Sequence, residues 1–289
     1  MDNKQTNKSQ IPNPKSQIPV CLTVAGLDPS GGAGIIADVK TFTAFGCFAT
    51  AAVTSLTFQN TTGVFGAVHQ TADSIRGQVL PIIEDFTIAA TKTGMLPNRE
   101  IIEEIAQIIK ENRLKNFVVD PVVRSTSGFD LIDDEALKVL TKMLFPLADL
   151  ITPNLPEAER ITRMKIVNEQ DIRQAAKKMQ SLGAKNVLIK GGHLFEGESR
   201  KPKGRKSKIA RDFLFLSDDL QIYEAEFIET NATHGTGCTL AAAIAANLAL
   251  GKNLIEAVEA AKEFVTQAIR SAPRLGRGHS PVNLLPKRY

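Results

Sequence analysis

The stretch IPVCLTVAGLDPSGGAG, residues 18–34, decides the fold class of this chain. Its first half, Ile18 to Ala25, is a short apolar run rich in β-branched residues, which predicts a buried strand. Its second half, Asp28 to Gly34, is a glycine-rich turn, and residues 35–45, closed by Gly46, have a helical pattern. A strand, a glycine turn and a helix in this order open a βαβ unit. The turn has neither the GK[ST] of a Walker A loop nor the GxGxxG fingerprint, so alone it is weak evidence of phosphate binding.

The alternation of strand and helix patterns continues along most of the chain. Further strands are predicted at residues 48–58, 64–69, 87–91, 117–119, 150–151 and 186–190, and further helices at residues 71–84, 98–113, from 133, 168–182, 239–250 and 253–270. Two apolar patterns, 212–216 and 221–227, are close enough for an antiparallel hairpin. The sequence therefore predicts an α/β fold, a mainly parallel central sheet with helices on both faces.

Length and composition favour one large domain, residues 18–289, after a polar leader, residues 1–17, that we expect to be disordered. With 43% hydrophobic and 23% charged residues the composition is that of an ordinary globular protein. The net charge of +4, the absence of Trp and the two Tyr argue against nucleic-acid binding. The basic run at residues 200–208 is short and isolated, so we expect a solvated surface loop.

The sequence also bears on location. No apolar run approaches the roughly 20 residues that cross a bilayer, and the leader lacks the apolar segment of a signal peptide. The three cysteines, Cys21, Cys47 and Cys238, are far apart and show no zinc spacing. We therefore expect a cytoplasmic protein without membrane contact.

Polar residues follow several of the predicted strands. Because the carboxyl ends of parallel strands meet at one edge of a sheet, these residues should converge on a ligand crevice there. The set consists of Asp28, Gln59, Lys92, Met95, Asp120, Asn154, Glu157, Lys190 and the loop at Gly235.

The loop Thr233-His234-Gly235-Thr236-Gly237-Cys238 precedes an alanine-rich helix and is the best candidate for the chemistry. Glycines let backbone N–H groups approach an anion, and the helix N-terminus adds partial positive charge. The same helix end should lower the pKa of the Cys238 thiol, which suits a base or nucleophile. The alternative is a plain glycine-rich connection capped by Thr.

The chain resembles the hydroxymethylpyrimidine and phosphomethylpyrimidine kinases of thiamine biosynthesis, which belong to the ribokinase-like superfamily. The resemblance runs from about residue 18 to 285 and is carried, in order, by AGLDPSGGAGI (25–35), ADVKTF (37–42), QNT (59–61), KTGML (92–96), DPV (120–122), TPNLPEA (152–158), KGGH (190–193) and HGTGCT (234–239). It implies a ribokinase-like fold with a small lid-like element. It also implies transfer of the ATP γ-phosphoryl group to 4-amino-5-hydroxymethyl-2-methylpyrimidine and then to the monophosphate, with Mg²⁺, in a homodimer.

The resemblance also implies roles for residues. Cys238 would be the base, where the wider superfamily has an aspartate, and Gly235, Thr236 and Gly237 would form the anion hole. The pyrimidine would contact Gln59, which would read its edge, and Asp38, Gly26, Ala33, Met95 and Val122. ATP would contact Asn154, Lys190 and Thr233. Mg²⁺ would be held by Glu157 and Asp120, in part through water.

Structural alternatives stay open for these assignments. Cys238 could be a small buried apolar residue, Gln59 a satisfied polar residue at a strand end, Asp38 a charge near a helix N-terminus, Asn154 and Glu157 a helix cap, and Lys190 a surface lysine. We expect His234 to stabilise its loop rather than to catalyse.

The sequence departs from the family pattern at Leu27, Ala232 and Thr126, the last in the lid-like loop. The nearest rival function is a pyridoxine or pyridoxal kinase of the same superfamily. One subgroup that handles pyridoxal carries a second cysteine in its lid, whereas residues 122–128 of this chain contain no cysteine, which argues against that function. A rival of another class is a non-catalytic pyrimidine-binding protein. The retained 235–238 loop, Asn154 and Glu157 argue against that.

Overall fold

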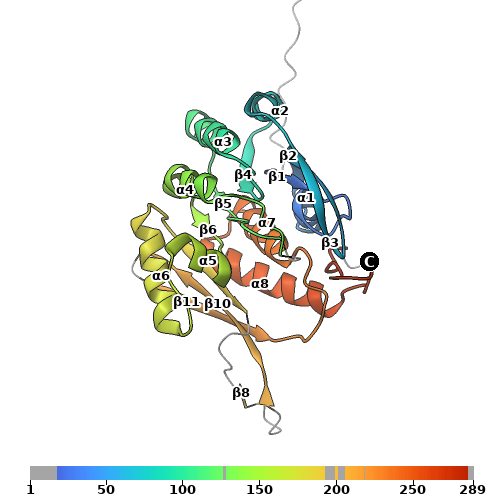
Figure 1. Ribbon diagram of the computed structural model, residues 1–289, viewed down its shortest axis with the longest axis vertical. Coiled ribbons are helices and arrows are strands. Elements are labelled where there is room, and N and C mark those ends of the chain that lie inside the picture. Colours follow the sequence, from blue (N-terminus) through green and yellow to red (C-terminus); the bar gives the residue numbers. More distant parts are fainter. Residues whose placement is uncertain (1–17, 126–127, 193–198, 201–205, 218, 286–289) are drawn as a thin grey trace, which may run out of the picture.

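The computed structural model describes residues 18–125, 128–192, 199–200, 206–217 and 219–285. A nine-stranded sheet runs through it in the order β11-β10-β7-β6-β5-β4-β1-β2-β3 (Figure 1). The strands from β7 to β2 are parallel, and β3, β10 and β11 join the two edges antiparallel. The mainly parallel sheet predicted from the sequence is confirmed.

The sheet strands agree with the sequence pattern. Their bounds are β1 Val20–Leu27, β2 Phe48–Asn60, β3 Gly63–His69, β4 Ile88–Thr93, β5 Phe117–Val119, β6 Leu150–Ile151, β7 Val187–Gly192, β10 Ile209–Phe215 and β11 Leu220–Glu226. The predicted hairpin is β10–β11, paired from Ile209 with Glu226 to Phe215 with Leu220.

Helices cover both faces of the sheet. Their bounds are α1 Gly34–Ala44, α2 Ala72–Asp85, α3 Arg99–Asn112, α4 Asp134–Met143, α5 Leu155–Thr162, α6 Glu169–Ser181, α7 Thr236–Ala249 and α8 Leu254–Arg270, with a short 3-10 turn at Phe145–Leu147. Helices α1, α7 and α8 lie on one side, and α2, α3, α4 and α6 on the other (Figure 1). No helix in the described ranges is long and apolar enough to span a membrane.

Alternating strand residues explain the two-sided core. In β5, Phe117 and Val119 pack among α3 and α4, whereas Val118 between them packs against the alanines of α7. Since the middle of α7 is rich in alanine and fully buried, the helix can approach the strands closely, and its N-terminus is thereby fixed at the carboxyl edge of the sheet.

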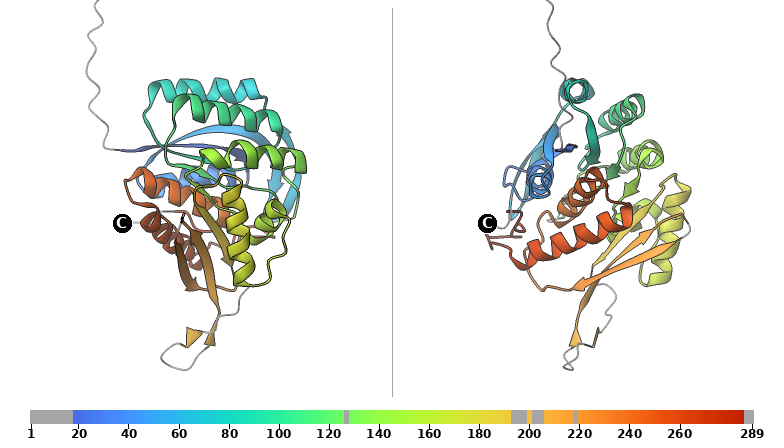
Figure 2. Two further views of the ribbon diagram at one scale, coloured as in Figure 1. Left: turned by 90° about the vertical axis from the view of Figure 1, so that its left-hand side faces the viewer. Right: turned by 180° about the vertical axis from the view of Figure 1, so that it is seen from behind.

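Two expectations need correction, and two fall outside the described part. The basic run is not simply a loop: Arg200 belongs to β8, Ser199–Arg200, which pairs antiparallel with β9, Lys206–Ser207, in a ribbon that projects from the body (Figure 2). Helix α7 begins at Thr236, three residues earlier than predicted, so Gly237 and Cys238 lie inside its first turn. The leader 1–17 and Thr126 lie outside the described residues.

Candidate active site

A cavity of about 530 Å³ opens at the carboxyl ends of the parallel strands. All but one of the predicted site residues line it: Gly26, Ala33, Gln59, Met95, Asp120, Val122, Asn154, Glu157, Lys190, Thr233, Gly235, Thr236, Gly237 and Cys238. The exception is Asp38, which is fully buried. The expectation that Lys92 faces the crevice is wrong, because its side chain is also fully buried and pairs with Asp38 instead of lining the cavity. Strand topology thus brings together segments that are far apart in sequence.

Asp28, which directly follows β1, connects the two glycine loops. Its Oδ1 accepts hydrogen bonds from Ser30 N and Oγ at 2.8 and 2.7 Å, and its Oδ2 accepts from Gly32 N and Ala33 N at 3.2 and 2.9 Å. His234 Nε2 lies 2.7 Å from the same Oδ2. The expected loop-stabilising role of His234 is confirmed.

Burial alone would raise the pKa of Asp28, but hydrogen bonds from His234, Ser30 and Gln59 hold it well below its usual range. From the sequence, Asp28 is predicted only to lie at a strand end beside the crevice. An Asp followed two residues later by Ser, within a glycine run, is the local signal of an Asx turn, and it could have predicted the hydrogen bonds from Ser30 to Asp28.

Gly235 is the N-cap of α7 and has φ +80°, a left-handed conformation. A Cβ at this position would lie 1.8 Å from the carbonyl oxygen of Gly32, so the two loops touch backbone to backbone. Thr236 N donates a hydrogen bond to Thr233 O at 3.3 Å. The N–H groups of Gly237 and Cys238 lie in the first turn, where a helix supplies no acceptor, so this end suits an anion.

Residues 275–282 form a strap that joins the two ends of the cavity wall. On one side, His279 N donates to Thr61 O at 2.8 Å, just beyond Gln59 at the end of β2. On the other side, His234 N donates to Ser280 O at 3.3 Å. The strap therefore fixes the spacing between the β2 end and the glycine loop.

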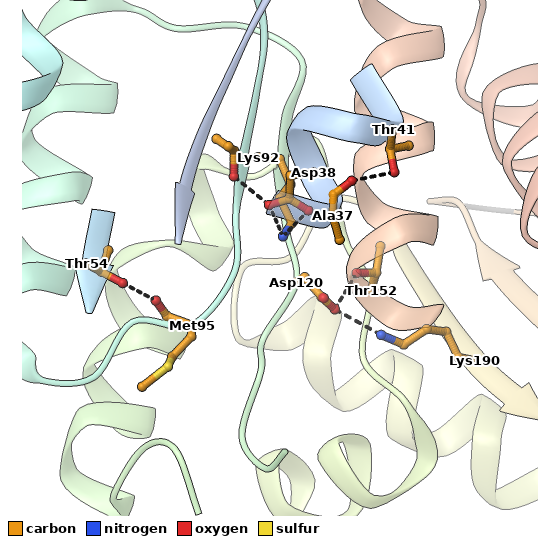
Figure 3. Close-up of polar contacts among 10 residues, drawn as sticks. Ala37, Asp38, Thr41, Thr54, Lys92, Met95, Asp120, Thr152 and Lys190 are labelled. Carbon is orange, nitrogen blue, oxygen red and sulfur yellow. Dashed lines mark hydrogen bonds and ion pairs between the residues drawn. The ribbon is translucent and has the colours of Figure 1, made fainter. Parts of the chain in front are cut away.

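A cluster of buried polar side chains around Lys190 lies in the cavity wall between Gln59 and the 235–238 loop. Lys190 Nζ lies 2.9 Å from Asp120 Oδ1 and 3.9 Å from Glu157 Oε2, and Thr152 Oγ1 donates to Asp120 Oδ1 at 3.0 Å (Figure 3). Lys190 is therefore not a surface lysine. A Cβ on Gly237 would lie 3.2 Å from Lys190 Nζ, so the ammonium faces the first turn of α7.

Asn154 and Glu157 form a capping box at α5. Asn154 Oδ1 accepts from Glu157 N at 2.9 Å, and Glu157 Oε2 accepts from Asn154 N at 2.7 Å. Burial, followed by the charge of Asp120, raises the pKa of Glu157 to about 7, although Lys190 and two backbone N–H groups oppose the shift. The helix-capping alternative is confirmed, and both residues also line the cavity.

Cys238 lies in the first turn of α7 with its side chain at the cavity wall. Burial raises its pKa to about 11; Asp120 and Asp38 add to the shift, whereas Lys92 and the Gly34 N–H oppose it. The expectation that the helix end lowers this pKa is wrong, because desolvation and two carboxylates outweigh the helix terminus.

One part of the cavity lies between α8 and the β10–β11 hairpin and was not foreseen. Lys262 Nζ and Asp212 Oδ2 are 2.6 Å apart there. The wall is otherwise largely apolar, with Phe227, Ile228 and Val265. No periodicity in the sequence predicts this slot, because it forms only where α8 packs beside the β10–β11 hairpin, which is a separate element.

The crevice lies at the carboxyl edge of a mainly parallel sheet, with the Gln59 carboxamide at one end and the N-terminus of α7, which suits an anion, at the other. This arrangement is typical of a ribokinase-like small-molecule kinase. Residues 28–283 match the family model described as phosphomethylpyrimidine kinase, and the chain belongs to that family.

Relatives agree with this assignment. The chain is 43% identical over 269 residues to a hydroxymethylpyrimidine/phosphomethylpyrimidine kinase of Haemophilus influenzae, covering 93% of this chain and 97% of the relative. It is 45% identical over 274 residues to a thiamine biosynthesis bifunctional protein of Geobacter sulfurreducens, covering 95% of this chain and 53% of that protein. This chain thus spans about half of the Geobacter protein.

Solved structures show the same fold. A phosphomethylpyrimidine kinase of Clostridium difficile superposes with a TM-score of 0.74 at 41% identity, covering 87% of this chain and 99% of that one. The ADP complex of Bacillus subtilis pyridoxal kinase gives a TM-score of 0.81 at 38% identity, covering 92% and 97%. The ribokinase-like fold predicted from the sequence is confirmed.

Proposed function

We propose that this protein transfers the γ-phosphoryl group of ATP to the hydroxymethyl group of hydroxymethylpyrimidine and then to the resulting monophosphate. The observation that carries the proposal is the single cavity that joins Gln59 at one end to the 235–238 loop at the other. Its family membership and its relatives named for this reaction support the same activity.

The pyrimidine would lie against Gln59, Gly26, Ala33, Met95 and Val122. A carboxamide offers a donor and an acceptor, which match the edge of an aminopyrimidine. The apolar members of the set would contact the ring faces. Gln59 is one of the groups that lower the pKa of the Asp28 carboxyl, so its side chain lies near Asp28, and because a carboxylate only accepts, the amide nitrogen of Gln59 would face it.

The phosphates would lie against the first turn of α7. The N–H groups of Gly237 and Cys238 would stabilise the charge that develops on the transferred group, and Lys190 would add a positive charge beside them. The apolar slot between α8 and the β10–β11 hairpin would take the base of ATP, with Thr233 at its edge.

The donor set fits a hydrated Mg²⁺. Asp120 and Glu157 are carboxylates on the same wall, and Lys190 Nζ lies 2.9 Å from the first and 3.9 Å from the second. Among the described residues no group of three His, Cys, Asp or Glu side chains could hold a metal alone, so phosphate oxygens and water would complete the shell. When bound, Mg²⁺ would neutralise phosphate charge.

Cys238 would take the proton of the substrate hydroxyl. The hydroxyl oxygen forms the new bond to phosphorus, the bond to the bridging oxygen of ADP breaks, and the proton moves to Sγ. The thiol must reach its thiolate form first, and because burial raises its pKa to about 11, kcat should rise with pH throughout the range below that value.

ADP release with Mg-ATP tests the activity. Hydroxymethylpyrimidine and its monophosphate should both support turnover, and failure of both would remove the kinase proposal. Gln59→Ala should raise the KM for the pyrimidine strongly and leave that for ATP unchanged. Cys238→Ala should lower kcat by about 100-fold or more, and a full rate would remove only the base assignment.

A pyridoxal kinase activity is the second candidate. The structural likeness to the Bacillus subtilis pyridoxal kinase favours it, whereas the sequence of residues 122–128 holds no cysteine. Measuring kcat/KM for pyridoxal beside hydroxymethylpyrimidine separates the two candidates, and we expect the pyrimidine to be preferred.

We also propose a cytoplasmic homodimer. The three cysteines form no disulfide, which suits a reducing compartment. On the β2–β3 edge, Leu56, Phe58 and Val68 share one face and Phe65 is 69% exposed, an apolar surface that a second copy would cover. Phe65→Ser with Phe58→Ser should convert the dimer to a monomer in light scattering, and a monomeric wild type would refute the assembly.

A further inference from the structure

Lys92 and Asp38 form an ion pair with no solvent contact. Lys92 Nζ lies 2.8 and 3.0 Å from the two carboxylate oxygens of Asp38, and Thr23 Oγ1 donates to Asp38 Oδ2 at 2.6 Å (Figure 3). Both side chains are 0% exposed. A buried ion pair is a poor source of stability, because desolvation offsets most of the attraction, so this one calls for a functional explanation.

The ammonium of Lys92 lies immediately behind the cavity wall. A Cβ on Gly94 would come within 2.9 Å of Lys92 Nζ, and Gly94 itself lines the cavity together with Cys238. The buried positive charge therefore lies next to a residue of the cavity lining. Helix α7, which carries Cys238, packs directly on strand β4, which carries Lys92.

The charges of groups on several elements act on the Cys238 thiol. These groups are Lys92 of β4, Asp38 of α1 and Asp120 at the end of β5. A charge on Cys238 also raises the pKa of Lys190 of β7. Of the groups that favour a negative sulfur, Lys92 is the strongest, ahead of the backbone N–H of Gly34. Burial would lower the pKa of Lys92 itself, but the charges of Asp38, Cys238 and Asp120 raise it above its usual range, so the side chain stays protonated.

We propose that Lys92, held in place by Asp38, is a positioning residue for phosphoryl transfer, which stabilises the negative charge on the Cys238 sulfur from behind the cavity wall. The proposal rests on the proposed role of Cys238 as the base. Before transfer the thiol loses its proton to solvent and the sulfur is held as a thiolate beside the ammonium. During transfer the sulfur accepts the hydroxyl proton and becomes a neutral thiol, while Lys92 gains and loses no proton.

This assignment also gives Asp38 a role other than substrate contact. Three hydrogen bonds fix its carboxylate between Thr23 and Lys92, so it orients the ammonium toward Gly94. Its own negative charge acts against a thiolate, but more weakly than Lys92 acts for it.

The titration of Cys238 tests the proposal. Alkylation of Cys238 by iodoacetamide, followed by peptide mass spectrometry at several pH values, reports the thiolate fraction. Lys92→Met should lower the alkylation rate near pH 8 by about tenfold or more, which corresponds to about one pKa unit. Lys92→Met with Asp38→Asn should fall between Lys92→Met and wild type, because it removes the opposing charge as well, and Lys92→Arg should stay near wild type.

Controls separate this role from a structural one. Arg76→Met removes a cation from an ion pair with Glu104 on α2 and α3, outside the cavity lining, and should leave both the alkylation profile and kcat unchanged. In a Cys238→Ala background the double variant should cause no further loss of kcat, since Lys92 acts through the sulfur. A further loss there would overturn the proposal.

Two results would overturn it directly. One is a folded double variant whose Cys238 alkylates with the wild-type pH profile. The other needs no variant: in the wild-type protein the Nζ resonance of Lys92 should shift as Cys238 titrates, and an unresponsive resonance would refute the contact even where the variants fail to fold. If Cys238→Ala is fully active while Lys92→Met still alters the thiol titration, the base assignment fails and the electrostatic link stands.

Discussion

Replacing Gly235 by Ala tests whether contact between the two glycine loops sets the rate. Gly235 has φ +80°, and a Cβ there would lie 1.8 Å from Gly32 O, where real Cβ contacts stay beyond 3.0 Å. The loop must therefore retreat by more than an ångström. The first turn of α7 begins at the next residue, so the N–H groups of Gly237 and Cys238, the proposed anion hole, must move with it.

The size of the effect follows from that displacement. A misplacement of about 1 Å in a reacting geometry can cost about 100-fold in rate, which is about 2.7 kcal/mol of barrier. Left-handed backbone adds about 1–2 kcal/mol of strain for an alanine. We therefore expect Gly235→Ala to lower kcat by about 100-fold or more and to destabilise the fold by a few kcal/mol, with little change in the KM for the pyrimidine.

Gly251→Ala is the matched control at the other end of α7. Gly251 has φ +86°, but a Cβ there would meet nothing within 4 Å. It should lose only the backbone strain, about 1–2 kcal/mol, and keep the wild-type kcat. Steady-state kinetics and urea unfolding of both variants decide the matter. If Gly235→Ala retains more than about half of the wild-type kcat, the loop contact does not position the anion hole.

Three further results are expected. Asp28→Asn should lower the free energy of unfolding by about 3 kcal/mol, because a carboxamide cannot accept all the bonds that converge on Asp28 and bonds to a charged group are worth about 1.5–3 kcal/mol each; urea unfolding should show Glu103→Gln, in an exposed pair, close to wild type. Since the pKa of Asp28 is lower in the folded state, its stabilisation is complete above about pH 4, and the deficit of Asp28→Asn should shrink in more acidic solution. For Glu157 the folded pKa of about 7 exceeds the ordinary value, so wild-type stability should fall relative to Glu157→Gln between about pH 5 and pH 7, and a flat difference would contradict this. Asn253→Ala removes the capping box of α8 and should cost about 1 kcal/mol of stability with an unchanged kcat, and a drop in kcat would show that α8 shapes the site.

Much of the fold follows from local pattern. The helices predicted at residues 98–113 and 253–270 are present as α3 and α8, where Asn98 caps the first and Asn253 and Glu256 form the capping box of the second. The β8–β9 ribbon was not foreseen, because its paired strands are two residues long, basic and without apolar alternation. The first turn of α7 was missed because Thr, Gly and Cys have low helix propensity and only tertiary packing makes them helical.

The site was predictable where topology alone decides it. Residues that follow parallel strands must meet at one edge, so the wall from Gln59 to Lys190 was foreseen. The Asp28–His234 contact was not, since it joins residues 206 positions apart and carries no local pattern. The pKa of Cys238 shifts in the direction opposite to the prediction, because the sequence shows the helix end but neither the burial of the thiol nor the charges of Asp120 and Asp38.

The strap at residues 275–282 has a consequence for the order of synthesis. The glycine loop at residues 233–237 is held by residues that leave the ribosome only after more than forty further additions, a few seconds at about 5–20 residues per second. During that interval the growing polypeptide can pair its parallel strands, but Ser280 O is not yet present to accept the hydrogen bond from His234 N in the glycine loop. A nascent chain stalled before residue 275 should therefore be compact and protease-resistant over the sheet, yet unable to retain ATP.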